Sequence, residues 1–573
     1  MFNRPQAVTA ICVLLVASVF SQTTTDSDQK LAADFWAWRV LTGQYTGDDV
    51  TRVERPHGVQ RDWSAAGVEK QKRELASFEE RWRQLDDPPE AVSQQVDHRL
   101  IGSALARVRW ELDVLNRWQR DPNFYLEQTL TPVGEALTVP GPYDEGQSRE
   151  ILARLDAIPA ILDEAEQNLS SPPAPLARMA IDSLAGIRSK LETVARTLPP
   201  QTAISAGAWQ SSTERAASSL ERYRSWLQKE LATLPAQSAI GREKYLWFLR
   251  NVALLPYTPE EMVSQAELEW HRAVAFEGIE QNRSRSVPPL VMAATTEEWI
   301  ERNRKSELEV RDFLEQKGIR TLAPGLQHFT LRSVPPYLSA LGDFLEMDDF
   351  TSPSRLNQNG IRYVAPPSLN GGYFWVDDAE DPRIQIVHEG TVGHYGQLCA
   401  SWNNPDPIRR HYYDSGANEG IGFYSEEMML QSGLYDDSPH AREIVYNQMR
   451  LRVLRVIADV NLALGTFTPE KAGDLLQRNV PMSADDARTE VVEMGEAPGQ
   501  KISYEIGKLQ ILTMLEAARQ QQGDQFSLRK FHDYLWLNGN VPIALQQWEY
   551  LGTDDEVKKL RPFQAASPVA NKN

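Results

Sequence analysis

Cysteine is nearly absent from this 573-residue chain, which has only Cys12 and Cys399. Cys12 lies in an N-terminal apolar run typical of an export signal, so the mature chain would keep one cysteine. A single cysteine cannot form an internal disulfide, and we therefore expect packing alone to stabilise the fold.

Positive charge is also scarce, because 60 basic residues face 79 acidic ones and the net charge is −19. Such a chain repels phosphate backbones, which argues against a nucleic-acid partner. The sequence also has no phosphate-binding glycine loop, no Gly-x-Ser-x-Gly elbow and no Cys-x-x-Cys pair. These gaps leave P-loop, serine-hydrolase and dithiol chemistries without a motif.

Long apolar runs are limited to the N-terminus, where "AVTAICVLLVASVF" (residues 7–20) follows "MFNRP". Val19 and Ser21 suit the positions before a cleavage site at Gln22. The run is shorter than the roughly 20 residues that a membrane span needs. We predict a signal peptide over 1–21 and an exported protein, periplasmic or extracellular, that has no membrane contact after cleavage. An uncleaved anchor is the alternative.

Helical periodicity is what the chain does contain. From about residue 28 to 345, segments such as "SSLERYRSWLQKELATL" place apolar residues three and four positions apart. Proline-bearing breaks fall at 130–146, 170–176, 198–201 and 333–338. Fifteen tryptophans argue against disorder. The pattern returns at 387 and holds to about 535, so we predict a mainly α fold.

Strand signals occur in "GIRYVAPPSLNGGYFWVDD", where glycine and proline flank "IRYVA" (361–365) and "GYFWV" (372–376). These two runs predict a small sheet, with irregular loop as the alternative. The segment "GGYFWV" (371–376), which contains Tyr373, could be an edge strand that pairs with an extended peptide. Plain sheet packing is the other interpretation.

Two histidines, His388 and His394, lie six positions apart in "VHEGTVGH". On a regular helix they would point about 120° apart and could not share one ion. A wide turn or helix bulge between them would bring them together. Gly390 and Gly393 are the residues that would permit such a turn.

An acidic segment, "SGANEGIGFYSEEMM" (415–429), follows downstream. Glu419 and Glu426 are seven apart, so they share one helix face, and Glu419 lies 25 residues past His394, a usual distance for a third zinc ligand. Two histidines and a carboxylate form an open catalytic zinc site. A solvated acidic face is the alternative, although the glycines at 420 and 422 weaken it because they destabilise a helix.

Four stretches together resemble the large bacterial family filed as domain of unknown function 885: "HEGTVGHYGQ", "NEGIGFYSEE", "APGQKISYEIGKLQI" and "FSLRKFHDYLWLNGNVPI". They cover about residues 360–545. That family is similar to the helical zinc metallopeptidases of the thimet-oligopeptidase and carboxypeptidase Taq type. The resemblance implies two lobes of helices with a deep, narrow cleft and a small sheet beside it. We expect an N-terminal helical region over 22–345 and a catalytic region over 346–573.

By position, the resemblance implies zinc as the cofactor, with His388, His394 and Glu419 as its ligands. Glu389 would be the general base that takes a proton from the attacking water and passes it to the leaving amine. The predicted function is a zinc-dependent hydrolase that cleaves peptide bonds in short peptides.

Four further residues complete the predicted site. Glu426 would orient a ligand, and Tyr504 would donate a hydrogen bond to the oxyanion. Lys508 shares the face of Tyr504, and Tyr373 is a candidate for substrate binding. An ordinary core tyrosine is the alternative for Tyr504.

Three positions depart from the family pattern and leave room for a degenerate site. Tyr395 replaces a second histidine, Ile421 replaces a tryptophan, and Ala463 stands where a histidine is expected. His411 could compensate, although an exposed loop histidine is the simpler interpretation. A catalytically inactive scaffold that binds peptides or a protein is therefore the alternative function, and a hydrolase of non-peptide amides is a third.

Overall fold

The computed structural model describes residues 26–46, 54–85 and 91–560. The predicted signal peptide, 1–21, lies outside these residues. None of the described helices is long and apolar enough to cross a membrane.

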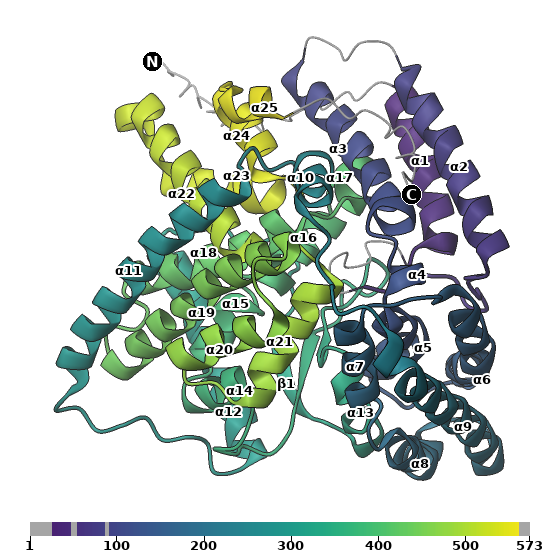
Figure 1. The fold of residues 1–573 in the computed structure, drawn as a ribbon. Helices are drawn as coiled ribbons and strands as arrows, with labels where there is room; N and C mark the ends of the chain where they lie inside the picture. The colour runs from purple at the N-terminus through teal and green to yellow at the C-terminus, as the bar shows by residue number, and fades with distance from the viewer. Residues whose placement is uncertain (1–25, 47–53, 86–90, 561–573) are drawn as a thin grey trace, which may run out of the picture.

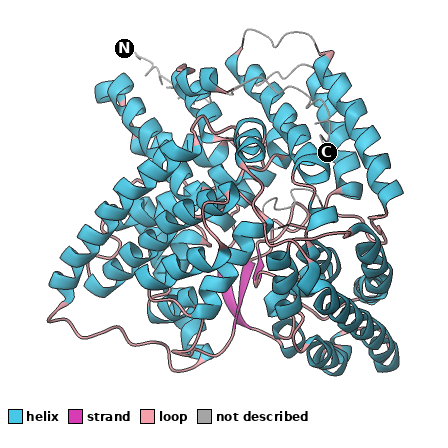
Figure 2. Cartoon of the chain, viewed as in Figure 1, coloured by secondary structure: helices cyan, strands magenta, loops and turns pink. Residues whose placement is uncertain are grey.

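Helices form most of the structure, which confirms the mainly α prediction, and they gather in two groups beside a small sheet (Figures 1 and 2). The first group, purple to blue in Figure 1, contains the first nine helices. These are α1 (Asp26–Thr42), α2 (Ala65–Arg83), α3 (Val92–Arg109), α4 (Arg117–Arg120), α5 (Pro122–Thr138), α6 (Glu145–Asn168), α7 (Ala174–Ser183), α8 (Ile187–Thr197) and α9 (Ala206–Glu230).

Most later helices form the second group, teal to yellow in Figure 1. The later helices that precede residue 415 are α10 (Arg242–Asn251), α11 (Pro259–Ser284), α12 (Thr296–Gln316), α13 (Pro336–Ser339), α14 (Tyr373–Glu380), α15 (Arg383–His388), α16 (His394–Trp402) and α17 (Pro407–His411). The helices from residue 415 onward are α18 (Ser415–Ser432), α19 (Pro439–Leu464), α20 (Pro469–Asn479), α21 (Ala484–Glu496), α22 (Ser503–Gln522), α23 (Leu528–Leu537), α24 (Ile543–Leu551) and α25 (Asp555–Lys559). Single 3₁₀ turns occupy Pro199–Gln201, Leu231–Thr233, Gly342–Phe344 and Gly523–Gln525, and a π-helical turn occupies Trp110–Val114.

The predicted break at 130–146 begins too early, because α5 runs through Pro132 to Thr138. A proline inside a helix removes one hydrogen bond and strains the turn before it. Leu130, Val133 and Leu137 on the same helix are fully buried in the core of the first group. Their burial offsets the lost bond, because packing contributes more to helix stability than local propensity does.

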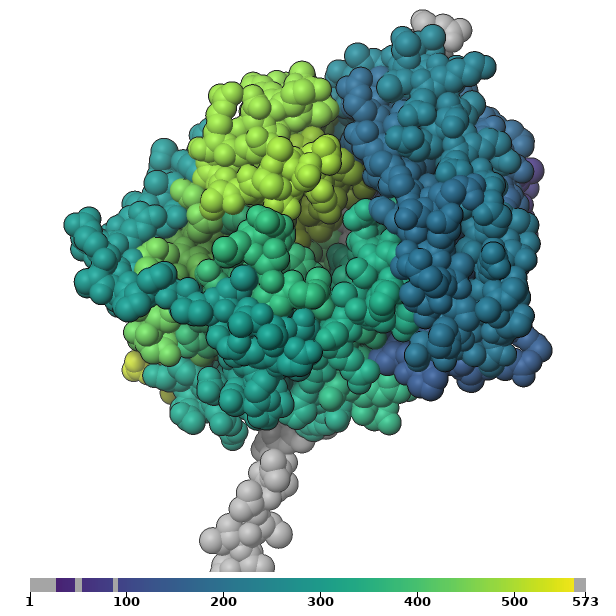
Figure 3. Space-filling model, turned by 90° about the horizontal axis from the view of Figure 1, so that it is seen from below, coloured from purple at the N-terminus to yellow at the C-terminus, as the bar shows by residue number. Residues whose placement is uncertain are grey.

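Helices that are far apart in the sequence pack together, both within the second group and between the two groups. Helix α11 packs along α19, whereas α24, near the end of the chain, packs on α3. Leu545 and Trp548 of α24 accordingly belong to the apolar core of the first group. Seen from below (Figure 3), the surface is hollowed between the blue helices and the green segments.

The sheet has three strands in the order β1-β3-β2. Strand β1 (Phe329–Ser333) runs parallel to β3 (Gly360–Val364), and the two-residue β2 (Asp348–Asp349) pairs antiparallel with β3. The "IRYVA" prediction is therefore confirmed as β3. Strand β1 lies in a stretch that we expected to be helical, and its five residues are too few to interrupt that longer pattern.

The strand prediction for "GYFWV" is wrong, because Tyr373 begins helix α14. Tyr373 and Phe374 pack into the cluster formed by α19 to α21, whereas Trp375 packs against Trp299 on another side. Because residues 373–376 are helical, the segment 371–376 cannot pair with an extended peptide as an edge strand. A short apolar run does not distinguish helix from strand by periodicity.

Candidate metal centre

A wide turn separates the two histidines, as their spacing predicted. His388 ends α15 and His394 begins α16. The amide of Tyr395 donates to the carbonyl of Glu389 at 3.0 Å, and that of Gly396 donates to Gly390 at 3.2 Å. Each bond spans six residues instead of four, so the turn holds two residues more than a helical one.

Gly393 makes this turn possible. A Cβ at that position would lie 1.8 Å from the carbonyl oxygen of His388, and one at Gly390 would lie 2.8 Å from that of Ile386. The first distance is far below van der Waals contact. No other residue fits at 393 unless the backbone moves.

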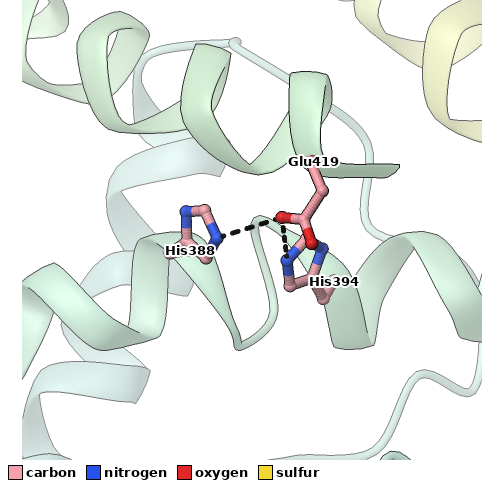
Figure 4. A group of neighbouring side chains, drawn as sticks. All are labelled: His388, His394 and Glu419. Atoms are coloured by element: carbon pink, nitrogen blue, oxygen red, sulfur yellow. Dashed lines mark ion pairs between the residues drawn. The ribbon is translucent and has the colours of Figure 1, made fainter. Parts of the chain in front are cut away.

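Glu419 reaches the histidines from α18, whose first turn is capped by the Asp414 carboxylate. Its Oε2 lies 3.1 Å from Nε2 of His394 and 3.6 Å from Nε2 of His388 (Figure 4). The imidazole rings are 4.7 Å apart and nearly perpendicular. All three side chains are buried, and ligand atoms of the three lie within 4.8 Å of one another.

Two glycines on α18 allow the close approach. A Cβ at Gly422 would lie 3.0 Å from Cε1 of His388 and 3.1 Å from Cε1 of His394. Gly420 faces Gly507 of α22, with its Cβ position 2.7 Å from the Cα of that glycine. The unusual glycines of this helix therefore mark two contacts, one with the imidazoles and one with α22.

The arrangement fits a zinc ion. Bonds of about 2.0–2.2 Å in a tetrahedral site place ligand atoms about 3.3 Å apart. The two separations from Oε2 of Glu419, 3.1 and 3.6 Å, lie on either side of that value. This oxygen is also buried without a hydrogen-bond donor among the described residues. Among the residues that the structure describes, His388, His394 and Glu419 form the group of histidine, cysteine or acidic side chains close enough together to hold a metal ion.

Glu426 determines which nitrogen of His388 faces the cluster. Its Oε1 lies 2.7 Å from Nδ1 of His388 and accepts a hydrogen bond from Arg452 at 3.0 Å. Nδ1 therefore donates outward and Nε2 is left for the centre. Burial lowers the pKa of His388, but the nearby carboxylates of Glu419 and Glu426 outweigh this and raise the pKa to about 9.

Glu389 lies on the wall of a cavity of about 460 Å³ that also exposes both histidines and Glu419. Its Oε1 is 3.4 Å from Nη1 of Arg362, on strand β3. Burial acts to raise the pKa of Glu389, but the Arg362 guanidinium and the imidazoles hold it below the usual value. The carboxylate therefore stays ionised beside the cluster.

Tyr504, from α22, lines the same cavity. Its ring lies 6.1 Å from that of His388 and nearly parallel to it. Burial, reinforced by Glu419, raises the pKa of Tyr504 well above its usual value. The phenol therefore keeps its proton and can act as a donor.

Lys508 and Tyr373 lie outside the cavity lining. The ammonium of Lys508 is buried among Glu269 (3.1 Å), Glu505 (3.1 Å) and Glu427 (3.3 Å). It contributes to the low pKa of Glu426, after the larger effects of burial, Arg452 and His388. Tyr373 instead donates a hydrogen bond to Asn447.

The three departures from the family pattern are buried in apolar clusters. Tyr395 is fully buried beside Phe329, with ring centres 5.4 Å apart. Ala463 belongs to the apolar cluster of α10 and α19, and Ile421 is fully buried in the core around α18. His411 packs against Trp36 of α1. The chain thus assembles the cluster with His394, not with a residue at position 395.

Several cavity residues were missed by sequence reasoning. Glu346 and Asp348 precede or form β2, Arg362 lies on β3, and Trp375 is on α14. Strand pairing brings Asp348 beside Arg362, whereas Glu346 and Trp375 lie on no strand and no sequence spacing relates them to the histidine motif. The opposition of Asp348 and Arg362 across β2 and β3 is the one relation that a correct sheet prediction would have revealed.

Comparison with solved structures shows the same fold elsewhere. "The structure of a putative lipoprotein of unknown function from Shewanella oneidensis" has a TM-score of 0.68 and 20% sequence identity, covering 92% of this chain and 99% of that one. "The crystal structure of the putative lipoprotein from Colwellia psychrerythraea" has a TM-score of 0.69 and 16% identity, with the same coverages. No curated protein matches the sequence.

Comparison with family models gives the family. The model described as "Bacterial protein of unknown function (DUF885)" matches residues 44–547. This span includes the candidate metal centre, the sheet and most of both helix groups. The chain therefore belongs to the bacterial DUF885 family.

Proposed function

We propose that this protein is a zinc-dependent hydrolase that cleaves peptide bonds in short peptides. One observation carries the proposal: His388, His394 and Glu419 converge on one point at the wall of a cavity that Glu389 and Tyr504 also line. The similarity of the family motifs to helical zinc metallopeptidases supports the same reaction. Small-molecule sites usually have volumes of about 300–1,000 Å³. The cavity, at about 460 Å³, is therefore large enough for a short peptide.

The roles of the side chains follow from their positions. A bound zinc ion would supply Lewis acidity toward a carbonyl group and toward water. Glu389, ionised and held by Arg362, would accept a proton from the attacking water and return it to the leaving amine. Tyr504 would donate its phenolic hydrogen to the negative charge that develops on the carbonyl oxygen.

Export forms part of the proposal. The two similar structures are described as lipoproteins, and the N-terminal apolar run of this chain has the length and flanks of a signal peptide. A periplasmic or extracellular peptidase would meet peptides released outside the cytoplasm.

Metal analysis is the first test. We expect the purified protein to bind one zinc ion, and His388→Ala to lose it because one of three protein ligands is removed. His271→Ala, which changes an exposed histidine on α11, is the matched control and should keep the full zinc content. If the His388→Ala protein bound zinc at the wild-type stoichiometry, His388 would not be a zinc ligand.

Cleavage is the second test. Digestion of a peptide mixture should proceed with zinc and stop with a chelator. Glu389→Gln should keep the metal but lose about 10²–10⁴-fold in turnover, because the general base is gone. Zinc binding without cleavage by the wild type would instead favour a scaffold, and unchanged turnover in Glu389→Gln would reject its role.

A further inference from the structure

The cavity beside the metal centre holds more negative charge than a zinc ion would neutralise. Four carboxylates line it, those of Glu346, Asp348, Glu389 and Glu419, and Arg362 is the one lysine or arginine among its lining residues. With all four carboxylates counted as ionised and both imidazoles as neutral, the excess is three negative charges. A divalent ion would still leave one uncompensated.

The guanidinium of Arg362 is already shared between acidic groups. It lies 3.4 Å from Glu389 and 3.8 Å from Asp348, and the nearby Asp378 adds to its high pKa. Glu346 has no hydrogen bond or ion pair with any described residue and is exposed in the cavity. Oδ1 of Asp348, whose side chain is only 7% exposed, is buried without a hydrogen-bond donor in the described part of the chain.

A second metal ion does not explain these carboxylates. Among the described residues, the group of three that could hold an ion is the one formed by His388, His394 and Glu419. An ammonium group needs fewer ligands and binds carboxylates through charge-assisted hydrogen bonds. Leu345, Met347 and Trp375 line the cavity beside Glu346 and Asp348. This wall therefore suits a cation carried on an apolar stem or flanked by apolar groups.

We propose that Glu346, with Asp348 behind it, is a specificity-determining residue that binds an ammonium group of the peptide. The cation is either the free N-terminus or a lysine side chain, because both present the same chemistry. The inference rests on the proposed function for its substrate but names a charge preference that the proposed function does not require.

Calorimetric titration of four peptides tests the preference and separates the two sources of the cation. Ala-Phe-Ala-Ala and its N-acetyl form differ at the N-terminus, where acetylation replaces the ammonium with a neutral amide. N-acetyl-Lys-Phe-Ala-Ala and N-acetyl-norleucine-Phe-Ala-Ala differ only in the side-chain ammonium. Metal-free protein prevents turnover, so affinity is read without activity. We expect the cationic member of at least one pair to bind about tenfold more tightly or better.

Glu346→Gln should reduce this advantage to less than about threefold, and Glu346→Lys should make the cationic peptide the weaker binder. Glu192→Gln, which changes an exposed carboxylate on α8, is the matched control and should retain the advantage. Equal affinities within both pairs in the wild type would overturn the inference, as would an unchanged advantage in folded Glu346→Gln.

The two proposals fail separately. A zinc-loaded protein that cleaves both members of each pair equally well, with equal affinities, keeps the proposed function and overturns the charge preference. A protein that prefers the cationic peptide but cleaves none overturns the proposed function and supports Glu346 as a binding residue.

Discussion

Gly422 has only a hydrogen atom as its side chain, and this lack of a Cβ affects the geometry of the metal centre. Helix α18 carries Glu419 at the centre and passes directly over both imidazoles at Gly422. Any side chain there would begin 3.0 Å from His388 and 3.1 Å from His394, closer than most Cβ contacts. The glycine therefore permits the carboxylate and the imidazoles to approach one point.

We predict that Gly422→Ala weakens zinc binding by about tenfold or more while the fold persists, since displaced ligands bind metal less well. Competition with a chromophoric chelator measures the affinity, and circular dichroism reports the helices. Gly473→Ala on α20 is the matched control, because a Cβ there meets nothing within 4 Å. Equal zinc affinity in the two variants would show that α18 can move aside at no cost to the centre.

The residues of the site divide by how they can be predicted. His388, Glu389, His394 and Glu419 come from two continuous motifs, and the six-residue spacing of the histidines itself demands the turn that the structure contains. Glu346 has no such relation to any of them in the sequence. It reaches the cavity because the 342–348 segment leads into β2, and no spacing rule describes that path.

At the scale of elements, the crossing of α18 and α22 brings Tyr504 to the cavity. The helices approach at Gly420 and Gly507, where a Cβ on Gly507 would lie 2.2 Å from the carbonyl oxygen of Gly416 and 2.8 Å from Cα of Gly420. Both nearest atoms belong to the backbone and cannot rotate away. This crossing leaves no room for a larger residue.

We predict that Gly507→Ala separates the two helices and lowers the free energy of unfolding by about 1–3 kcal/mol, the usual effect of overpacking. Tyr504 lies one turn before Gly507, so peptide turnover should fall more than zinc affinity does. Thermal denaturation, zinc competition and cleavage rates measure the three effects. Gly278→Ala, at an open position of α11, is the control. A variant as stable and active as this control would contradict the role of the crossing.

Individual elements also show where sequence patterns fail to predict secondary structure. The long amphipathic helices were predictable because apolar residues recur over many turns. The "GYFWV" segment has five apolar or glycine residues in a row, so strand and helix fit it equally well. Its helical form is decided by Tyr373 and Trp375, which pack on different sides against α19 to α21 and Trp299. Such contacts are tertiary and leave no local signal.

For the molecule as a whole, His532 of α23 links three distant segments. Its Nδ1 lies 2.8 Å from the carbonyl oxygen of Ile319, which can only accept, so Nδ1 carries the proton. Its Nε2 then accepts from the hydroxyl of Tyr424, also at 2.8 Å. The side chain is fully buried, and Tyr424 lies on α18, the helix that carries Glu419. Protonation of His532 would require the Tyr424 hydroxyl to rotate and accept a hydrogen bond from Nε2.

Burial lowers the pKa of His532 from 6.5 to about 4, despite the hydrogen bond to Ile319. The unfolded chain therefore binds this proton more readily than the folded one. The contribution to stability is complete above about pH 7 and falls as the pH drops from about 6.5 to about 4. At pH 5 the loss amounts to about 2 kcal/mol. We predict that His532→Gln, which cannot titrate, shows a smaller decrease in Tm between about pH 7.5 and pH 5 than the wild type does.

Thermal denaturation of metal-free protein at the two pH values provides the measurement, because zinc release would otherwise add its own pH dependence. His532→Gln lowers Tm at both values through lost packing, so the decisive quantity is the difference between them. His271→Gln, at an exposed position of α11, should keep the pH dependence of the wild type. An equal decrease in Tm for the wild type and His532→Gln would mean that His532 accepts a proton in the folded state.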